Sequence, residues 1–169
     1  MRFILLIHIM LFWIFDLDFT LYQLPRGDSF SYSKLSQDSQ LRYLLRKLPC
    51  KKIMFTNGTV FHADTCIKRL QIGGCFNNVI ARDSIQDLKP NPSAFQKFEI
   101  FNKITREDKC VFFEDSVDNL IIAKDRGWIT VLIHPDRNAN QHENIDFYFP
   151  NIYIALNFFN QKIDDHFDF

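Results

Sequence analysis

Short runs of apolar residues recur along this chain, and each is bounded by polar residues, glycine or proline. They cover residues 11–15, 53–55, 111–113 and 129–133, with a weaker run at 147–149. Strands that are buried on both faces of a parallel sheet read as continuous apolar runs, whereas strands with one solvated face alternate apolar and polar residues. The runs therefore predict a mostly parallel sheet that is covered on both faces.

The segments between these runs carry the spacing of amphipathic helices. Apolar residues recur at the intervals of one helix face at Leu41, Leu44, Leu45 and Leu48. Further helices are expected around residues 94–98 and 120–124, the second ending near Gly127, because glycine is common just past a helix end. Strands and helices in alternation predict an α/β fold with helices on both faces of the sheet.

Length and charge narrow the class of protein. With 169 residues and no linker-like segment, the chain is expected to form one domain over residues 1–169. Twenty Lys and Arg residues balance twenty Asp and Glu residues, which argues against a protein that holds nucleic acid or an anionic membrane mainly by charge. The four cysteines form no CxxC pair, so we expect reduced thiols and a cytoplasmic location.

The first fifteen residues form an almost unbroken apolar stretch after Arg2, which has the outline of a signal peptide. No small-residue cleavage site follows, and the stretch is shorter than the roughly 20 residues that span a bilayer. We therefore expect a buried strand preceded by an apolar extension at residues 1–9, with a signal or anchor as the minor alternative.

Residues able to carry chemistry follow three of the apolar runs. They are Asp16 and Asp18, then Thr56 and Asn57, then Glu114 and Asp115. In parallel α/β folds, ligands bind beyond the carboxyl ends of the strands. Carboxylates that converge there would repel one another unless a cation neutralised them, and oxygen ligands of this kind suit Mg²⁺. Such a metal favours a phosphate-bearing substrate, to which Thr56 could offer a hydroxyl and Lys89 a positive charge.

Four segments, in order, resemble the motifs of the haloacid dehalogenase-like (HAD) superfamily. They are FDLDFTLY at residues 15–22, FTNG at 55–58, Lys89-Pro90, and FFEDS at 112–116 with Asn119. Within the superfamily, LRYLL at 41–45, the Thr-Asn pair followed by His62-Ala63, and FFEDS are most similar to the pyrimidine 5′-nucleotidase-like group. The resemblance covers most of residues 11–149 and implies a three-layer, Rossmann-like core.

The resemblance also implies a division of labour. Asp16 would attack phosphorus and form an aspartyl-phosphate intermediate. Asp18 would protonate the leaving oxygen and then deprotonate the hydrolytic water, while Thr56, Asn57 and Lys89 would hold the phosphoryl group. Mg²⁺ would be bound by Asp16, the backbone carbonyl of Asp18 and Asp115. Glu114 is either a further metal ligand or an acid behind the ligands, and the sequence leaves both open.

Two features depart from, or add to, this pattern. The nucleotidase-like group carries a helical cap between its first two motifs, but here only residues 21–33 are free to form one, which is enough for a flap. A cap excludes water and contacts the leaving group, so the inherited substrate is in doubt and a second copy of the chain could close the site. His62 belongs to a segment that resembles the pyrimidine 5′-nucleotidase-like group, and we favour a structural role for it.

Three functions follow. The first is a Mg²⁺-dependent phosphatase that acts on small phosphomonoesters, with nucleoside 5′-monophosphates among the candidates. The second is a capless phosphatase that acts on a phosphoprotein or a nucleic-acid end, and the neutral net charge disfavours the nucleic-acid version. The third is an inactive relative that keeps the scaffold for binding. No membrane association is expected under any of them.

Overall fold

The structure, a computed structural model, describes residues 9–24, 29–136 and 142–164. Its elements in chain order are β1 (Leu11–Phe15), the 3-10 helix η1 (Tyr32–Lys34), α1 (Ser39–Lys47), β2 (Lys51–Phe55), α2 (Val60–Leu70), β3 (Asn78–Ile80), α3 (Arg82–Ile85), α4 (Pro92–Asn102), β4 (Lys109–Glu114), α5 (Val117–Asp125), β5 (Ile129–Ile133), β6 (Phe147–Phe149) and α6 (Ile152–Asp164). The apolar extension expected at residues 1–9 lies outside the described residues, except for Ile9.

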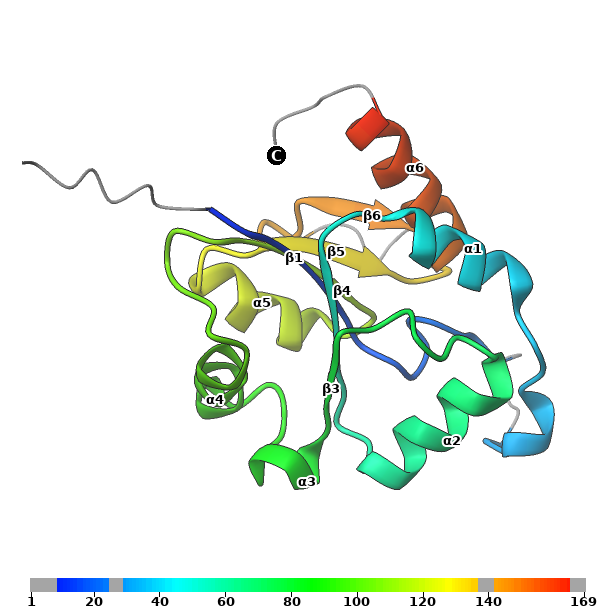
Figure 1. The fold of residues 1–169 in the computed structure, drawn as a ribbon. Helices are drawn as coiled ribbons and strands as arrows, with labels where there is room; N and C mark the ends of the chain where they lie inside the picture. The colour runs from blue at the N-terminus through cyan, green and yellow to red at the C-terminus, as the bar shows by residue number, and fades with distance from the viewer. Residues whose placement is uncertain (1–8, 25–28, 137–141, 165–169) are drawn as a thin grey trace, which may run out of the picture.

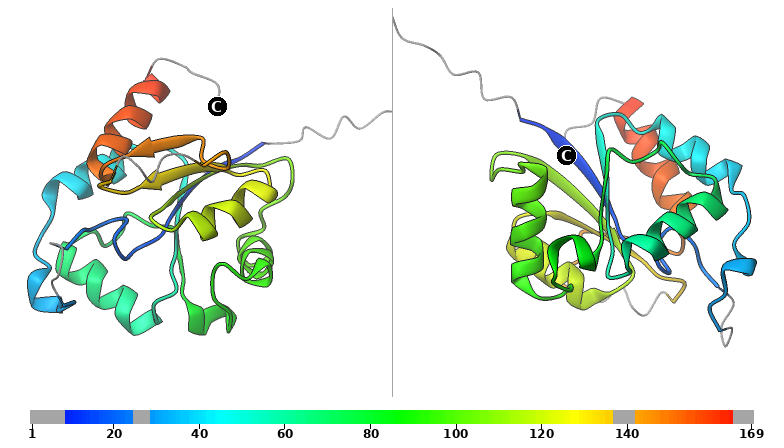
Figure 2. Two further views of the ribbon diagram at one scale, coloured as in Figure 1. Left: turned by 180° about the vertical axis from the view of Figure 1, so that it is seen from behind. Right: turned by 60° about the horizontal axis from the view of Figure 1, so that its bottom comes forward.

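The six strands form one sheet in the order β3-β2-β1-β4-β5-β6, and every pairing is parallel. Helices α1, α2 and α6 cover one face, while α3, α4 and α5 cover the other (Figure 1). Figure 2 shows the same two helical layers from behind and from below. The predicted parallel α/β architecture with helices on both faces is confirmed.

Successive residues of the central strands point into the two helical layers. Trp13 and Phe15 of β1 face α1 and α6, whereas Phe12 and Ile14 face α4 and α5. All four are buried. Because both faces of β1 are covered, no position of this strand tolerates a polar residue, which is why its sequence is a continuous apolar run.

The sequence analysis located five of the six strands and missed β3, the 3-10 helix η1 and the three α-helices α2, α3 and α6. Strand β3 has only three residues, and it is held by pairing with β2 and by a 2.9 Å hydrogen bond from the Asn78 side chain to Asn102. Helix α5 ends as predicted, with Gly127 in the left-handed region at φ +81°. Of the helices in the described part of the chain, none is long and apolar enough to cross a membrane.

Helix α6 completes the aromatic core on its face of the sheet. The buried ring of Phe159 lies 5.6 Å from Trp13 and 5.3 Å from Phe113, centroid to centroid. We expect Phe159→Ala to lower the free energy of unfolding by about 3–5 kcal/mol in a urea titration. Phe101→Ala removes a ring that is 60% exposed and should change the free energy of unfolding by about 0.5 kcal/mol or less. Equal losses in the two variants would contradict this account of the core.

Candidate active site

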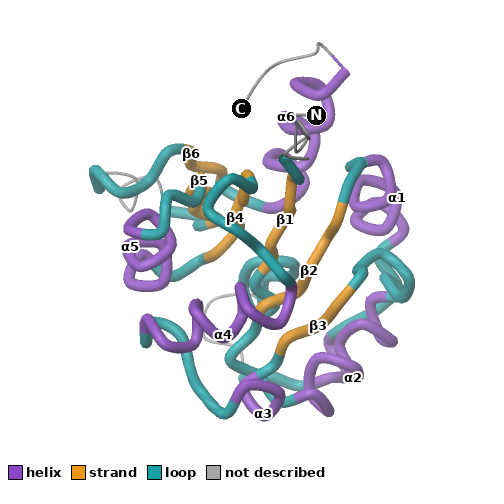
Figure 3. The backbone as a smooth tube through the Cα atoms, turned by 60° about the vertical axis from the view of Figure 1, so that its left-hand side comes forward, coloured by secondary structure: helices purple, strands orange, loops and turns teal. Residues whose placement is uncertain are grey.

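The candidate residues come together at one edge of the sheet. Strand β1 lies between β2 and β4, so Asp16, Thr56 and Asp115 each follow the carboxyl end of a neighbouring strand (Figure 3). Lys89 reaches the same place from the loop that precedes α4. A hollow of about 280 Å³ is lined by these strand ends and includes Asp16, Asp18, Asn57, Lys89, Glu114, Asp115 and Asn119.

Lys89 is the central cation of the site. Its ammonium group donates to Asp16 Oδ1 at 2.8 Å, to Glu114 Oε2 at 2.7 Å and to the backbone oxygen of Phe55 at 2.8 Å. Burial alone would lower the pKa of Lys89, but the two adjacent carboxylates raise it above its usual value. Lys89 therefore remains protonated and balances part of the negative charge around Asp16.

Asn57 and Thr56 use their side chains to shape the loops that carry the site. The Asn57 amide donates to the Lys89 backbone oxygen and accepts from the Lys89 backbone N–H, both at 2.8 Å. Thr56 Oγ1 accepts from the Gly58 backbone N–H at 2.9 Å, which leaves its hydroxyl proton free to donate. Asn57 thus fixes the position of Lys89, and the predicted contact of both side chains with substrate stays a prediction.

Glu114 is held by four hydrogen bonds. Oε2 accepts from Lys89 and from the side chain of Asn119 at 2.9 Å, and Oε1 accepts from the backbone N–H groups of Asp115 and Ser116 at 3.1 and 3.2 Å. Burial would raise the pKa of Glu114, but Lys89 and these donors hold it below its usual value. Its oxygens are committed to the protein, and this favours a role behind the metal ligands rather than among them.

Asp16, Glu114 and Asp115 form an acidic cluster in which one oxygen of each lies within 4.8 Å of the others. Burial and the neighbouring Glu114 raise the pKa of Asp16 to about 7. Burial and contact with Glu114 raise the pKa of Asp115 to about 8. Lys89 contacts only Asp16 and Glu114 of these three carboxylates, so the cluster carries excess negative charge and fits a divalent cation that prefers oxygen ligands, such as Mg²⁺.

The raised pKa values predict how metal-free protein responds to pH. Asp16 and Asp115 are protonated more readily in the folded chain than in the unfolded chain, where the usual value is 3.8. Their contribution to stability is therefore complete below about pH 4 and is lost as the pH rises through 7 to 8. We expect the Tm measured in EDTA to fall between about pH 6 and about pH 9.

Mg²⁺ should reverse this loss, because a cation binds the ionised carboxylates and stabilises the folded state. The Tm gain from Mg²⁺ should be larger at about pH 9 than at about pH 6. Asp115→Asn serves as the matched variant and should lose most of both responses. A Tm gain from Mg²⁺ that is independent of pH and survives in Asp115→Asn would contradict a metal site at this cluster.

Asp18 lies outside the acidic cluster and has a separate set of partners. Its Oδ1 accepts from the Tyr22 hydroxyl and lies 2.8 Å from His62 Nε2. The other ring nitrogen of His62 lies 3.0 Å from the Tyr32 hydroxyl. Both contacts fall on Oδ1, and within the described part of the chain no hydrogen bond engages Oδ2. This Asp18 network comprises Asp18, Tyr22, Tyr32 and His62.

The sequence analysis missed part of this network. It favoured a structural role for His62, which stays a prediction, but it did not foresee the contact of the ring with Asp18, and it assigned nothing to Tyr22 or Tyr32. The position of Gly58 shows how tightly His62 is placed, because a Cβ at Gly58 would lie 2.7 Å from the His62 ring. The identity of the residue at position 58 was the available signal, since a glycine permits a close approach.

The segment between β1 and α1 bears on the expected flap. Its described part contains a turn at residues 19–21 and the 3-10 helix η1, and residues 25–28 lie outside the described residues. Phe30 packs edge-on against His62 with a centroid distance of 5.2 Å. The segment therefore contacts the Asp18 network from the side of residues 29–34, and loss of a helical cap stays a prediction.

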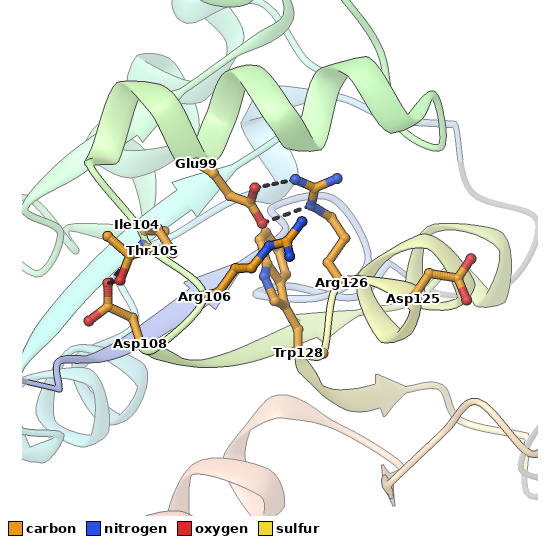
Figure 4. A pocket seen from close by; sticks show the side chains of 9 residues that line it. Glu99, Ile104, Thr105, Arg106, Asp108, Asp125, Arg126 and Trp128 are labelled. Carbon is orange, nitrogen blue, oxygen red and sulfur yellow. Dashed lines mark hydrogen bonds and ion pairs between the residues drawn. The ribbon is translucent and has the colours of Figure 1, made fainter.

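A second hollow lies at the opposite edge of the sheet. It has a volume of about 430 Å³ and is lined by residues that precede β4 and β5, among them Asp108 and Trp128. Glu99 and Arg126 form an ion pair across it (Figure 4). Because the strands are parallel, this hollow is at their amino ends and contributes nothing to the candidate active site.

Comparison with known proteins agrees with the architecture. No protein-family model matches the chain. The L-2-haloacid dehalogenase from Xanthobacter autotrophicus superposes with a TM-score of 0.62 and 18% identity, covering 79% of this chain and 63% of that one. A HAD phosphatase from Thermococcus onnurineus gives a TM-score of 0.54 and 24% identity, with 70% and 54% covered.

A third solved structure was obtained with magnesium. The HAD-hydrolase YfnB from Bacillus subtilis, solved bound to magnesium, gives a TM-score of 0.55 and 15% identity, covering 70% of this chain and 54% of that one. The chain thus spans between about half and two thirds of the length of these three proteins. At such identities a likeness establishes architecture and not activity. The chain has the fold of the haloacid dehalogenase-like (HAD) superfamily.

Proposed function

We propose that this protein is a Mg²⁺-dependent phosphomonoester hydrolase that works through an aspartyl-phosphate intermediate. The observation that carries the proposal is the pairing of Asp16 with Lys89 beside the acidic cluster, with the separately held Asp18 two residues further on. This arrangement offers a nucleophile, a fixed positive charge, a cation site and an acid-base group at one strand edge. Small phosphomonoesters, including nucleoside monophosphates, are the proposed substrates.

In the first step, a carboxylate oxygen of Asp16 attacks phosphorus and the ester P–O bond breaks. Asp18 gives a proton from Oδ2 to the leaving oxygen, so the product departs as an alcohol. In the second step, Asp18 takes a proton from water, which attacks phosphorus and releases Asp16 and inorganic phosphate. Bound by Asp16 and Asp115, Mg²⁺ would offset the negative charge of the carboxylates and of the phosphoryl group.

Asp18 and the acidic cluster also favour phosphate ester hydrolysis over haloacid dehalogenation, which is the activity named for one structural neighbour. A halide leaves without a proton, and displacement from carbon by one carboxylate needs no divalent cation. In a dehalogenase, Asp16 would still be the nucleophile, but Asp18 would have no leaving group to protonate and the cluster would have no cation to bind. In a phosphatase both have a use, because the leaving alkoxide needs a proton and the phosphoryl group carries charge.

Product release tests the proposal directly. Purified protein is incubated with phenyl phosphate and with nucleoside monophosphates, with Mg²⁺ or with EDTA, and in parallel with chloropropionate. We expect phosphate release that depends on Mg²⁺ and no chloride release. Chloride release that persists in EDTA would overturn the proposal in favour of a dehalogenase, and the absence of both products would overturn it in favour of a macromolecular substrate or a binding role.

The Asp18 network predicts a leaving-group effect. In His62→Ala, Asp18 loses one of its two fixed partners, so proton transfer to the leaving oxygen should slow by about 10-fold or more. Alkyl phosphates need that proton, whereas nitrophenyl phosphate releases a stable phenolate and should be much less affected. His62→Gln is the matched variant, because its amide can still donate to Oδ1. Equal losses on alkyl and nitrophenyl phosphates would assign His62 a structural role only.

A further inference from the structure

A groove adjoins the candidate active site on the far side of Asp18. It has a volume of about 390 Å³ and is lined by Asp18, Asn57, Gly58, Thr59, His62 and Arg82. Asp18 and Asn57 also line the hollow that holds the acidic cluster, so the two spaces are adjacent. If Asp18 protonates the leaving oxygen, the leaving group extends into this groove.

Arg82 supplies the groove with a permanent positive charge. Its side chain is exposed, and its backbone N–H donates to the Gly58 backbone oxygen at 3.1 Å, which ties Arg82 to the groove wall. Among the residues that the structure describes, no ion pair or side-chain hydrogen bond engages its guanidinium. Arg82 lines this groove, where Asp18 is the one carboxylate among the described lining residues, and it also lines a neighbouring hollow with Asp83 and Asp87. Asp18 already contacts Tyr22 and His62.

The acids next to Arg82 in the sequence are engaged elsewhere. Asp83 accepts from the Val60 backbone N–H at 2.9 and 3.2 Å, at the start of α2. Asp87 accepts from the Ser93 hydroxyl and lies 3.3 Å from the Lys97 ammonium. Within the described part of the chain, neither acid forms an ion pair with Arg82, so its guanidinium remains available to an anion from solution.

We propose that Arg82 binds a second anionic group on the leaving-group side, so that the preferred substrates are phosphomonoesters whose alcohol carries a carboxylate or a further phosphate. A guanidinium binds either anion through two parallel hydrogen bonds. The Thr59 hydroxyl lines the same groove and accepts from the His62 backbone N–H at 3.1 Å, which leaves its own proton for the anion. The inference rests on the proposed function only for the direction in which the leaving group extends.

This substrate class differs from simple nucleoside monophosphates. A nucleoside leaving group is uncharged and would leave Arg82 without a partner. An anionic leaving group gains a charge-assisted contact in the complex, which should raise kcat/KM by about 10-fold or more. Arg82 is therefore expected to separate these two kinds of phosphomonoester.

Turnover of a matched series tests the proposal. The three esters are propyl phosphate, the phosphate ester of hydroxypropionate and propanediol bisphosphate, which differ in carrying no second anion, a carboxylate or a phosphate. We expect kcat/KM to be at least about 10-fold higher for one or both anionic esters. Arg82→Gln should reduce that ratio to near one. Arg69→Gln removes an exposed charge from the last turn of α2 and should preserve the ratio.

Equilibrium binding separates failure of this proposal from failure of the proposed function. Calorimetry with propylphosphonate and carboxypropylphosphonate, which are not hydrolysed, measures the second-anion contact in wild type and in Arg82→Gln without any turnover. Tighter binding of the carboxylated ligand by wild type alone supports the Arg82 site even where no ester is hydrolysed. Equal binding of the two ligands by wild type, or a preference that survives in Arg82→Gln, overturns the Arg82 proposal. Neither result bears on the proposed phosphatase activity, which phosphate release tests separately.

Discussion

Phosphate release should fall by about 10³-fold or more when Asp16 is replaced by asparagine. The amide has nearly the same shape as the carboxylate but cannot attack phosphorus, so the aspartyl-phosphate does not form. Because burial makes an ionised Asp16 costly, as its raised pKa shows, the neutral side chain should be accepted in the fold. We therefore expect the loss of activity without loss of stability.

Three measurements on Asp16→Asn check this expectation. Initial rates on phenyl phosphate give the loss, urea unfolding gives the stability, and acid-quenched wild-type protein is digested and searched for a phosphoaspartate at position 16. Asp118→Asn serves as the control, since Asp118 lines the same hollow but lies outside the acidic cluster. Asp16→Asn protein that keeps more than about a tenth of the wild-type rate would exclude Asp16 as the nucleophile.

Lys89→Met should destabilise the fold by about 3–5 kcal/mol and abolish activity. The ammonium group is buried and forms ion pairs with Asp16 at 2.8 Å and Glu114 at 2.7 Å. Methionine fills most of the same space but leaves the carboxylates without their counter-charge. The cost arises because a buried charge that loses its partner is far from water.

Two further variants show whether charge is the cause. Lys89→Met combined with Glu114→Gln removes one uncompensated carboxylate and should recover part of the lost unfolding free energy. Lys47→Met breaks the exposed pair of Lys47 with Asp164, and it should leave the free energy of unfolding nearly unchanged. Urea titrations of the three variants test this order. Lys89→Met that is no less stable than Lys47→Met would contradict the structural role of Lys89.

Strand positions in this protein could be predicted from local pattern because burial on both faces leaves a local trace. Residues 11–15 and 129–133 are strands with the predicted bounds. Strand β3 left no such trace, since Asn78 is polar and the strand depends on its neighbour β2. Helix α6 did leave a local trace, because its buried residues Ile152, Ala155, Leu156 and Phe159 have the spacing of one helix face, but the sequence analysis did not identify it.

The candidate site, too, could be predicted from the sequence only in part. Asp16, Asp18, Thr56, Glu114 and Asp115 could be selected from the sequence because parallel strands bring their carboxyl ends to one edge. Their individual contacts could not, because those contacts join residues far apart in the chain. Asn57 pairs with the backbone of Lys89, 32 residues away, and His62 contacts Asp18 across 44 residues.

The sequence by itself determined the sheet, the two helical layers and the set of carboxylate and hydroxyl side chains at the carboxyl ends of the strands. The tertiary structure alone decided that Glu114 is committed to four donors, that Asp18 is held by His62 and Tyr22, and that Arg82 faces a groove beside it. The physical reason is the distance along the chain over which each effect acts. Burial imposes a pattern on consecutive residues, whereas the direction and partners of a polar side chain are set by whichever elements the packing of the core brings next to it.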